Sequence, residues 1–112
     1  MNRWVSVCPV QELIPFVGVA ALVEGEQIAI FRLRLEHELY TISNYDPFSQ
    51  VYVLSRGIIG DKQGILKIAS PIYKHTFNLK TGECLDDPRV KLPVYPVRVV
   101  DGIVQIVPVN IS

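Results

Sequence analysis

Two short proline-centred segments carry the most informative side-chain spacing in this chain. Asp46-Pro47-Phe48 pairs two side chains at positions i and i+2, and Ser70-Pro71-Ile72-Tyr73 pairs two at i and i+3. A binuclear iron–sulfur site built from Cys-x-His and Cys-x-x-His uses this spacing, with two thiolates on one iron and two imidazoles on the other. Phe48 has no donor atom, and Asp46, Ser70 and Tyr73 offer hard oxygen instead of sulfur or nitrogen. The spacing of a cluster site is therefore present without its ligands.

The two segments are surrounded by short β-branched and apolar runs that turn residues separate. No apolar pattern continues at helical spacing over three turns. The pattern predicts one all-β domain over 1–112, a small sandwich or barrel of antiparallel strands. Hairpin turns are expected at Glu24-Gly25-Glu26 and at Asp101-Gly102, and a positive φ at Gly82. We expect strands over 3–7, 18–23, 27–33, 38–42, 65–69, 73–78, 97–100 and 103–107, a helical turn over 10–13, and an edge segment between Pro93 and Pro96.

The composition excludes several classes of function. Eleven basic residues balance eleven acidic ones, and this zero formal charge argues against a nucleic-acid partner. No apolar stretch approaches the ~20 residues of a membrane span, and the first fifteen residues lack the pattern of a signal peptide. We therefore expect a cytoplasmic protein in which Cys8 and Cys84 are reduced thiols. Hydrophobic residues make up 49% of the chain, which fits either a subunit interface or a well-filled β core.

Beyond the two loops, the order of the elements resembles the Rieske ferredoxin domain. The resemblance covers nearly the whole chain, from about Trp4 onward. It implies a Rieske-like (ISP domain) fold with degenerate cluster-binding loops at about 44–49 and 69–76. The stretches that carry it are LYTISN (39–44), LSRGIIG (54–60), QGILKIAS (63–70), FNLKTGE (77–83) and YPVRVVDGIVQI (95–106).

Within that family, the version without any of the four ligands resembles the small subunits of bacterial NADH-dependent nitrite reductases. The supporting residues are IAIFR (28–32), ISNYDPF (42–48), VLSRGII (53–59) and ASP (69–71). The resemblance implies a non-catalytic small subunit without a cofactor of its own. Its partner would be a large subunit that carries FAD, siroheme and a [4Fe-4S] cluster and reduces nitrite to ammonium with NAD(P)H. Two alternatives stay open: an electron-transfer protein with an unusual centre, and a stand-alone protein-interaction module.

The resemblance also predicts how the loops hold together without a cluster. Phe48 and Tyr73 occupy the positions equivalent to the imidazoles, so we expect their rings to face each other in an aromatic and hydrogen-bonded plug. Burying two such rings contributes about 1.5–3 kcal/mol each, against about 3 kcal/mol for a tie across a loop of this length. Asp46 and Ser70 are expected to accept hydrogen bonds from amides of their own loops. As an alternative, the oxygens of Asp46, Ser70 and Tyr73 would make a poor cage for a hard metal ion.

The cysteines and histidines match the ligand count of a cluster but not its spacing. They occur in the order Cys8, His37, His75, Cys84. We expect His37 to be a solvated loop residue and His75 a surface or partly packed strand residue. The aromatic residues near the loops fit either interface anchors or caps of a small sandwich; they are Tyr45, Phe48, Tyr52 and Tyr73.

Overall fold

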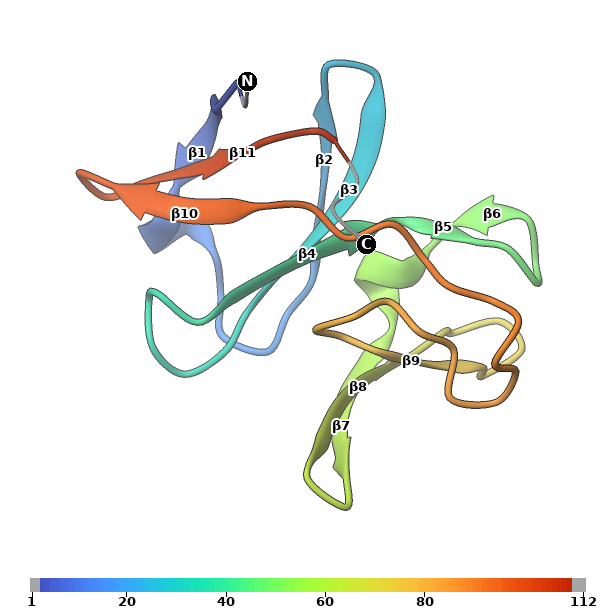
Figure 1. Ribbon diagram of the computed structural model, residues 1–112. Helices are drawn as coiled ribbons and strands as arrows, with labels where there is room; N and C mark the ends of the chain where they lie inside the picture. Colours follow the sequence, from blue (N-terminus) through green and yellow to red (C-terminus); the bar gives the residue numbers. More distant parts are fainter. Residues whose placement is uncertain (1–2, 110–112) are drawn as a thin grey trace.

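The computed structural model describes residues 3–109, which form eleven strands and two short 3-10 turns (Figure 1). No α-helix occurs in this described range, and no helix in it could span a bilayer. The all-β prediction is therefore confirmed. In chain order the elements are β1 (Val5–Pro9), η1 (Val10–Glu12), β2 (Val19–Val23), β3 (Glu26–Arg32), β4 (Leu39–Ser43), β5 (Tyr45–Asp46), β6 (Val51–Tyr52), η2 (Leu54–Arg56), β7 (Ile58–Lys62), β8 (Ile65–Ala69), β9 (Thr76–Asn78), β10 (Val97–Val100) and β11 (Ile103–Ile106).

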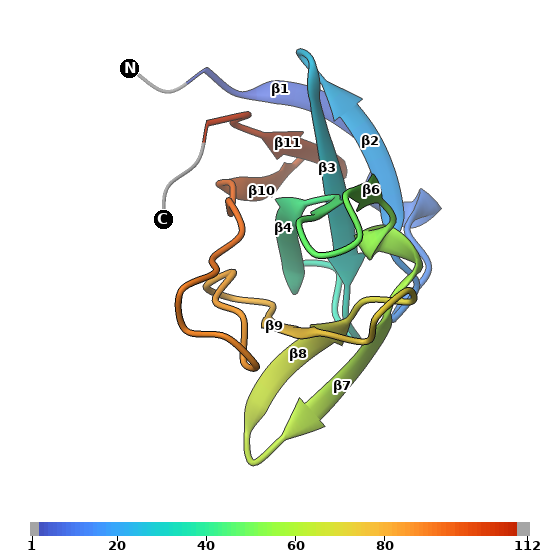
Figure 2. The same ribbon diagram turned by 90° about the vertical axis from the view of Figure 1, so that its right-hand side faces the viewer.

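The strands pair antiparallel in three three-stranded sheets and one two-stranded ribbon. The sheet orders are β1-β11-β10, β2-β3-β4 and β7-β8-β9, and the ribbon is β5-β6. Figure 1 shows the first sheet at one end of the molecule, the β7-β8 hairpin extending from the other end, and β2-β3-β4 between them. In Figure 2, turned by 90°, the β1-β11-β10 sheet and the β7-β8 hairpin again lie at opposite ends of the molecule. The β5-β6 ribbon and the β8–β9 connection therefore have to be joined by contacts other than a common sheet.

Two-residue turns close three of the hairpins. Glu24-Gly25, Gln63-Gly64 and Asp101-Gly102 each have both residues at positive φ, between 49° and 87°. This conformation suits the right-handed twist of the flanking strands, and glycine adopts it without a steric penalty. The first and third turns were predicted from the sequence, whereas the second was not, and with it the strand β7 was missed. Gln63-Gly64 was the signal that could have revealed it.

Two hydrophobic cores meet at β3, because alternate residues of a strand point to opposite faces. Ala29 and Phe31 pack in a core with β8, β9 and the segments that follow them. Ile28 and Ile30 pack on the other face, in a core with β1 and β11. All four side chains are fully buried. The two free cysteines belong to different cores, Cys84 to the first and Cys8 to the edge of the second.

The segment between Pro93 and Pro96 lies along the outer edge of β4, as the two prolines predicted. The Ser43 amide donates to the Pro93 carbonyl at 2.9 Å, and the Tyr95 amide donates to the Thr41 carbonyl at 3.1 Å. The Tyr95 hydroxyl donates to Glu26 at 3.2 Å. Burial, followed by the nearby Glu26 carboxylate, raises the pKa of Tyr95 to about 12. The predicted positive φ of Gly82 is also confirmed, at 83°.

Candidate functional site: the two proline-centred loops

The predicted site residues lie at the ends of short strands. Asp46 ends β5, and Phe48 lies in the turn that leads to β6, so both belong to the first loop (44–49). Ser70 follows directly after β8, and Tyr73 lies in the connection to β9, within the second loop (69–76). Asp46, Phe48 and Ser70 lie where the two loops contact each other. Tyr73 lies outside this contact and is exposed.

Asp46 joins the two loops through its buried carboxylate. The Ser70 hydroxyl donates to Asp46 Oδ2 at 2.5 Å across 24 positions of sequence. Within the first loop, the Ser49 hydroxyl donates to the same oxygen at 2.8 Å, and the Phe48 amide donates to Oδ1 at 2.9 Å. The Ile72 amide donates to the Ser70 hydroxyl at 3.3 Å. The expected amide bonds within each loop are therefore confirmed, and a direct bond between the loops is added to them.

The hydrogen bonds outweigh the effect of burial on the charge of Asp46. Burial raises the pKa of this carboxyl, since it disfavours the anion. Hydrogen bonds from the hydroxyls of Ser70 and Ser49, and from the amides of Phe48 and Ser49, favour the anion, and the net effect is a pKa below the ordinary value. Asp46 is therefore a buried carboxylate at neutral pH, and each of the donors around it stabilises that charge.

Phe48 stacks on His75 and not on Tyr73, so the predicted Phe48–Tyr73 contact is wrong. The Phe48 and His75 rings are parallel within 2°, with centroids 3.6 Å apart. The Phe77 ring is tilted by 42° to the Phe48 ring, and their centroids are 6.2 Å apart. Tyr73 is 64% exposed. The reason is local: Lys74 has a φ of 62°, which reverses the chain, and the strand β9 begins only at Thr76.

The second loop is closed at its base by backbone and carboxylate contacts. The Ser70 amide donates to the His75 carbonyl at 2.9 Å, which positions the imidazole beside the first loop. The amide and the hydroxyl of Thr76 donate to Asp86 at 2.6 and 3.0 Å. The Thr76 amide is the main reason that the pKa of Asp86 is lowered. His75 is partly buried, as expected for a partly packed residue, and His37 is exposed, as predicted.

The side chains at the joined loops do not fit a binuclear iron–sulfur cluster. Such a cluster needs two thiolates and two imidazoles. The Asp46 oxygens already accept hydrogen bonds from Ser70, Ser49 and Phe48, and the Phe48 side chain offers only carbon. The two cysteines lie in separate cores, and residues 3–109 contain no cluster of three or more His, Cys, Asp or Glu side chains that could bind a metal ion. The hard-metal alternative also lacks a cage, because Tyr73 points away into solvent at 64% exposure.

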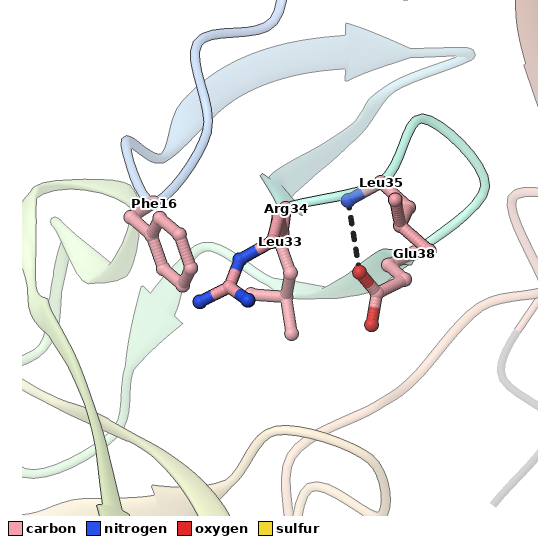
Figure 3. A pocket seen from close by; sticks show the side chains of 5 residues that line it. All are labelled: Phe16, Leu33, Arg34, Leu35 and Glu38. Atoms are coloured by element: carbon pink, nitrogen blue, oxygen red, sulfur yellow. Dashed lines mark hydrogen bonds between the residues drawn. The ribbon is translucent and has the colours of Figure 1, made fainter.

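One surface hollow borders the second loop, and another is formed by other segments of the chain. A groove of about 420 Å³ lies beside the second loop and includes Ser70, Pro71 and Lys74 in its lining. A second hollow, of about 370 Å³, is lined by Phe16 and by residues of the 33–38 segment (Figure 3). In Figure 3 the Phe16 ring and the Arg34 guanidinium border the same space, and the Leu35 amide donates to Glu38 at 2.8 Å. Neither hollow was predicted from the sequence.

The antiparallel sheets and the two facing loops define a Rieske-like domain. The sequence model of the Rieske-like [2Fe-2S] domain family matches residues 3–107, and the chain belongs to that family. The nitrite reductase (NADH) small subunit of Salmonella typhimurium is 43% identical over 106 residues, which are 95% of this chain and 98% of that one. Within the Rieske-like family, the chain therefore belongs with the small subunits of NADH-dependent nitrite reductases.

Two further comparisons bear on structure and on partners. The solution structure of a nitrite reductase [NAD(P)H] small subunit from Erwinia carotovora is 44% identical, with a TM-score of 0.83 over 100% of this chain and 86% of that one. A nitrite reductase [NAD(P)H] large subunit from Klebsiella oxytoca is 32% identical over 99 residues. This match covers 88% of the present chain but only 10% of the large subunit, so that protein contains a related segment within a much longer chain.

Proposed function

We propose that this chain is the non-catalytic small subunit of a cytoplasmic NAD(P)H-dependent nitrite reductase. Its partner is the large subunit, which carries FAD, siroheme and a [4Fe-4S] cluster and reduces nitrite to ammonium. The small subunit acts by contact with that partner and carries no redox centre.

The observation that carries the proposal is the filling of the two loops by protein side chains. In a Rieske centre, thiolates and imidazoles at such loops bind the irons. Here a buried Asp46–Ser70 hydrogen bond and the Phe48–His75 stack occupy the junction of the loops. These side chains cannot accept and release electrons at neutral pH, so electron transfer has to run through the cofactors of the partner.

The related segment in the Klebsiella large subunit supports the choice of partner. When two domains occur on one chain, each works at a high effective concentration of the other. A domain that is separate in one protein and part of the large chain in another is therefore expected to work in contact with that chain. The matching part of the large subunit, 10% of its length, aligns over 99 residues with 88% of the present chain, which is about one whole domain.

Copurification and activity measurements test the proposal. A tagged large subunit from the same organism should retain this chain through size-exclusion chromatography, and its NADH-dependent nitrite reduction or its thermal stability should rise when the chain is added. The purified small subunit should be colourless and free of iron. A preparation with two irons and acid-labile sulfide per chain would contradict the proposal and support the electron-carrier alternative.

A further inference from the structure

The groove beside the second loop is formed by the outer face of the β7-β8 hairpin. Ile58 pairs with Ala69 and Gly60 with Lys67, so these four residues share one face. The opposite face carries Ile68, which is fully buried in the core. Figure 1 shows the hairpin extending away from the other sheets. We call this hollow the basic groove.

The charges that line the basic groove are all positive. Arg56, Lys67 and Lys74 contribute them, and none of the residues that line the groove is acidic. The acidic side chains of the neighbouring loops include Asp46, Asp86 and Asp87, and each is engaged elsewhere. Asp46 accepts a bond from Ser70, Asp86 accepts two bonds from Thr76, and Asp87 pairs with Arg89. Since the chain as a whole has zero formal charge, the groove is a local concentration of positive potential.

Two backbone features of the groove are typical of a surface that binds another chain. Lys74 has a φ of 62°, a conformation that glycine adopts without strain and that lysine adopts only at an energetic cost. Gly60 lies within a strand, and a Cβ at this position would approach Lys67 Cε at 3.3 Å. A glycine inside a strand often marks a place where another backbone approaches closely.

The apolar and backbone surfaces of the groove suit an extended segment. Ile58 is 73% exposed although it is β-branched and aliphatic. Gly60 adds no side chain to this face, so the backbone of an extended segment can come close to the sheet there. The hollow in Figure 3 does not favour a partner of either charge, because its lining includes both Arg34 and Glu38.

We propose that the basic groove is the surface on which the large subunit docks, through an extended acidic segment with an apolar side chain over Ile58. The carboxylates of that segment pair with Arg56, Lys67 and Lys74, and its backbone passes over Gly60. This inference rests on the proposed function, because it names the contact surface between the two subunits.

Replacement of Lys74 by glycine separates binding from folding. Lys74→Gly removes one positive charge and also relieves the backbone strain, so the melting temperature should stay the same or rise. The affinity for the large subunit should fall about tenfold, since a paired charge at an interface is lost. Gln63→Gly is the matched control, because Gln63 also has a positive φ, 55°, but carries no charge. Interferometry with the full-length chains would measure both affinities.

Charge and shape of the groove can be tested separately. Arg56→Gln combined with Lys67→Gln should weaken binding further, and wild-type affinity should fall with salt because exposed charges are screened. Gly60→Val keeps every charge but fills the groove, and it should weaken binding at all salt concentrations. Lys91→Gln removes an exposed charge outside the groove and should leave the affinity unchanged.

The occupant can be identified by a photo-crosslinking residue at Ile58. The expected product joins Ile58 to a segment of the large subunit rich in Asp and Glu. A crosslink between two copies of this chain, or to a segment without acidic residues, would overturn the assignment. If wild type binds and Lys74→Gly binds equally well, the groove assignment is wrong while the proposed function stands. If wild type does not bind the large subunit, both fail.

Discussion

The β2-β3-β4 sheet and the two joined loops are stabilised in different ways. β3 pairs five residues with β2 and five with β4, and its central residues 28–31 are fully buried in two cores. The β5-β6 ribbon has only two paired positions, and the loops depend on Asp46, Ser70 and one ring stack. Burial in the sheet is spread over many side chains, whereas the loops depend on a few contacts that can be removed one at a time. We therefore expect the loop region to lose order before the sheets unfold.

The largest expected effect is at Phe31, in the sheet. Phe31→Ala should lower the free energy of unfolding by about 3–5 kcal/mol, because it leaves a cavity in a core that includes both β3 and β9. Chemical denaturation followed by circular dichroism measures this loss. Leu22→Ala on the neighbouring strand removes an apolar side chain that is 73% exposed, and should change stability by less than about 0.5 kcal/mol. Equal effects of the two substitutions would contradict the description of the core.

The next largest effect is expected at Asp46, in the loops. Asp46→Ala should cost about 2–3 kcal/mol, since hydrogen bonds to a charged group are lost and buried donors are left without an acceptor. Unlike Phe31→Ala, it should change amide NMR signals mainly within 44–49 and 69–76. Glu36→Gln on an exposed loop is the control. Signals that shift equally throughout β2-β3-β4 would show that loops and sheet do not behave separately.

Acid should affect the loops before the sheets. The folded-state pKa of Asp46 is lowered, so its stabilising contribution is complete above the unfolded-state pKa of about 3.9 and is lost as the pH falls through the lower folded value. Asp86 shifts in the same direction. Amide hydrogen exchange measured from pH 5 to pH 2 should therefore show opening of the loops first. In Asp46→Asn this dependence should be weaker, and an unchanged profile would exclude Asp46 as its source.

The smallest effect is expected from the aromatic stack. A double-mutant cycle of Phe48→Ala and His75→Ala should give a coupling of about 0.5–1.5 kcal/mol in stability. The same cycle with Tyr73→Ala in place of His75→Ala should give a coupling near zero, because Tyr73 is 64% exposed. A larger coupling of Phe48 to Tyr73 than to His75 would show that Tyr73 is the ring that contacts Phe48, as the sequence predicted.

Much of the strand arrangement was predictable because local signals agree with it. Glu24-Gly25 and Asp101-Gly102 form hairpin turns wherever strands flank them, and β-branched runs on both sides supply those strands. The strand β7 was not recognised because Gly60, Asp61 and Lys62 are all poor strand formers. Five paired positions with β8 and the packing of Ile59 against the core hold this segment extended.

The candidate site was predicted in its residues but not in all its contacts. The turns around Asp46 and Ser70 follow from the local hydrogen bonding that these side chains prefer. The partner of Phe48 was misassigned because Phe48 and Tyr73 occupy the positions equivalent to the imidazoles of a cluster site, and the two rings were expected to face each other for that reason. One positive φ at Lys74 reverses the chain and brings His75, not Tyr73, to the first loop. Local propensity does not predict such a conformation for lysine.

The residue types alone determined that the two loops lack sulfur and nitrogen ligands. The short apolar and β-branched runs between turn residues determined that the chain forms antiparallel β-structure. These properties belong to single residues and their near neighbours. The tertiary structure decided that Asp46 meets Ser70 and that Phe48 meets His75. It also placed Arg56, Lys67 and Lys74 around one groove. Contacts of this kind depend on strand register and on the path of a loop, which only the packing of distant segments sets.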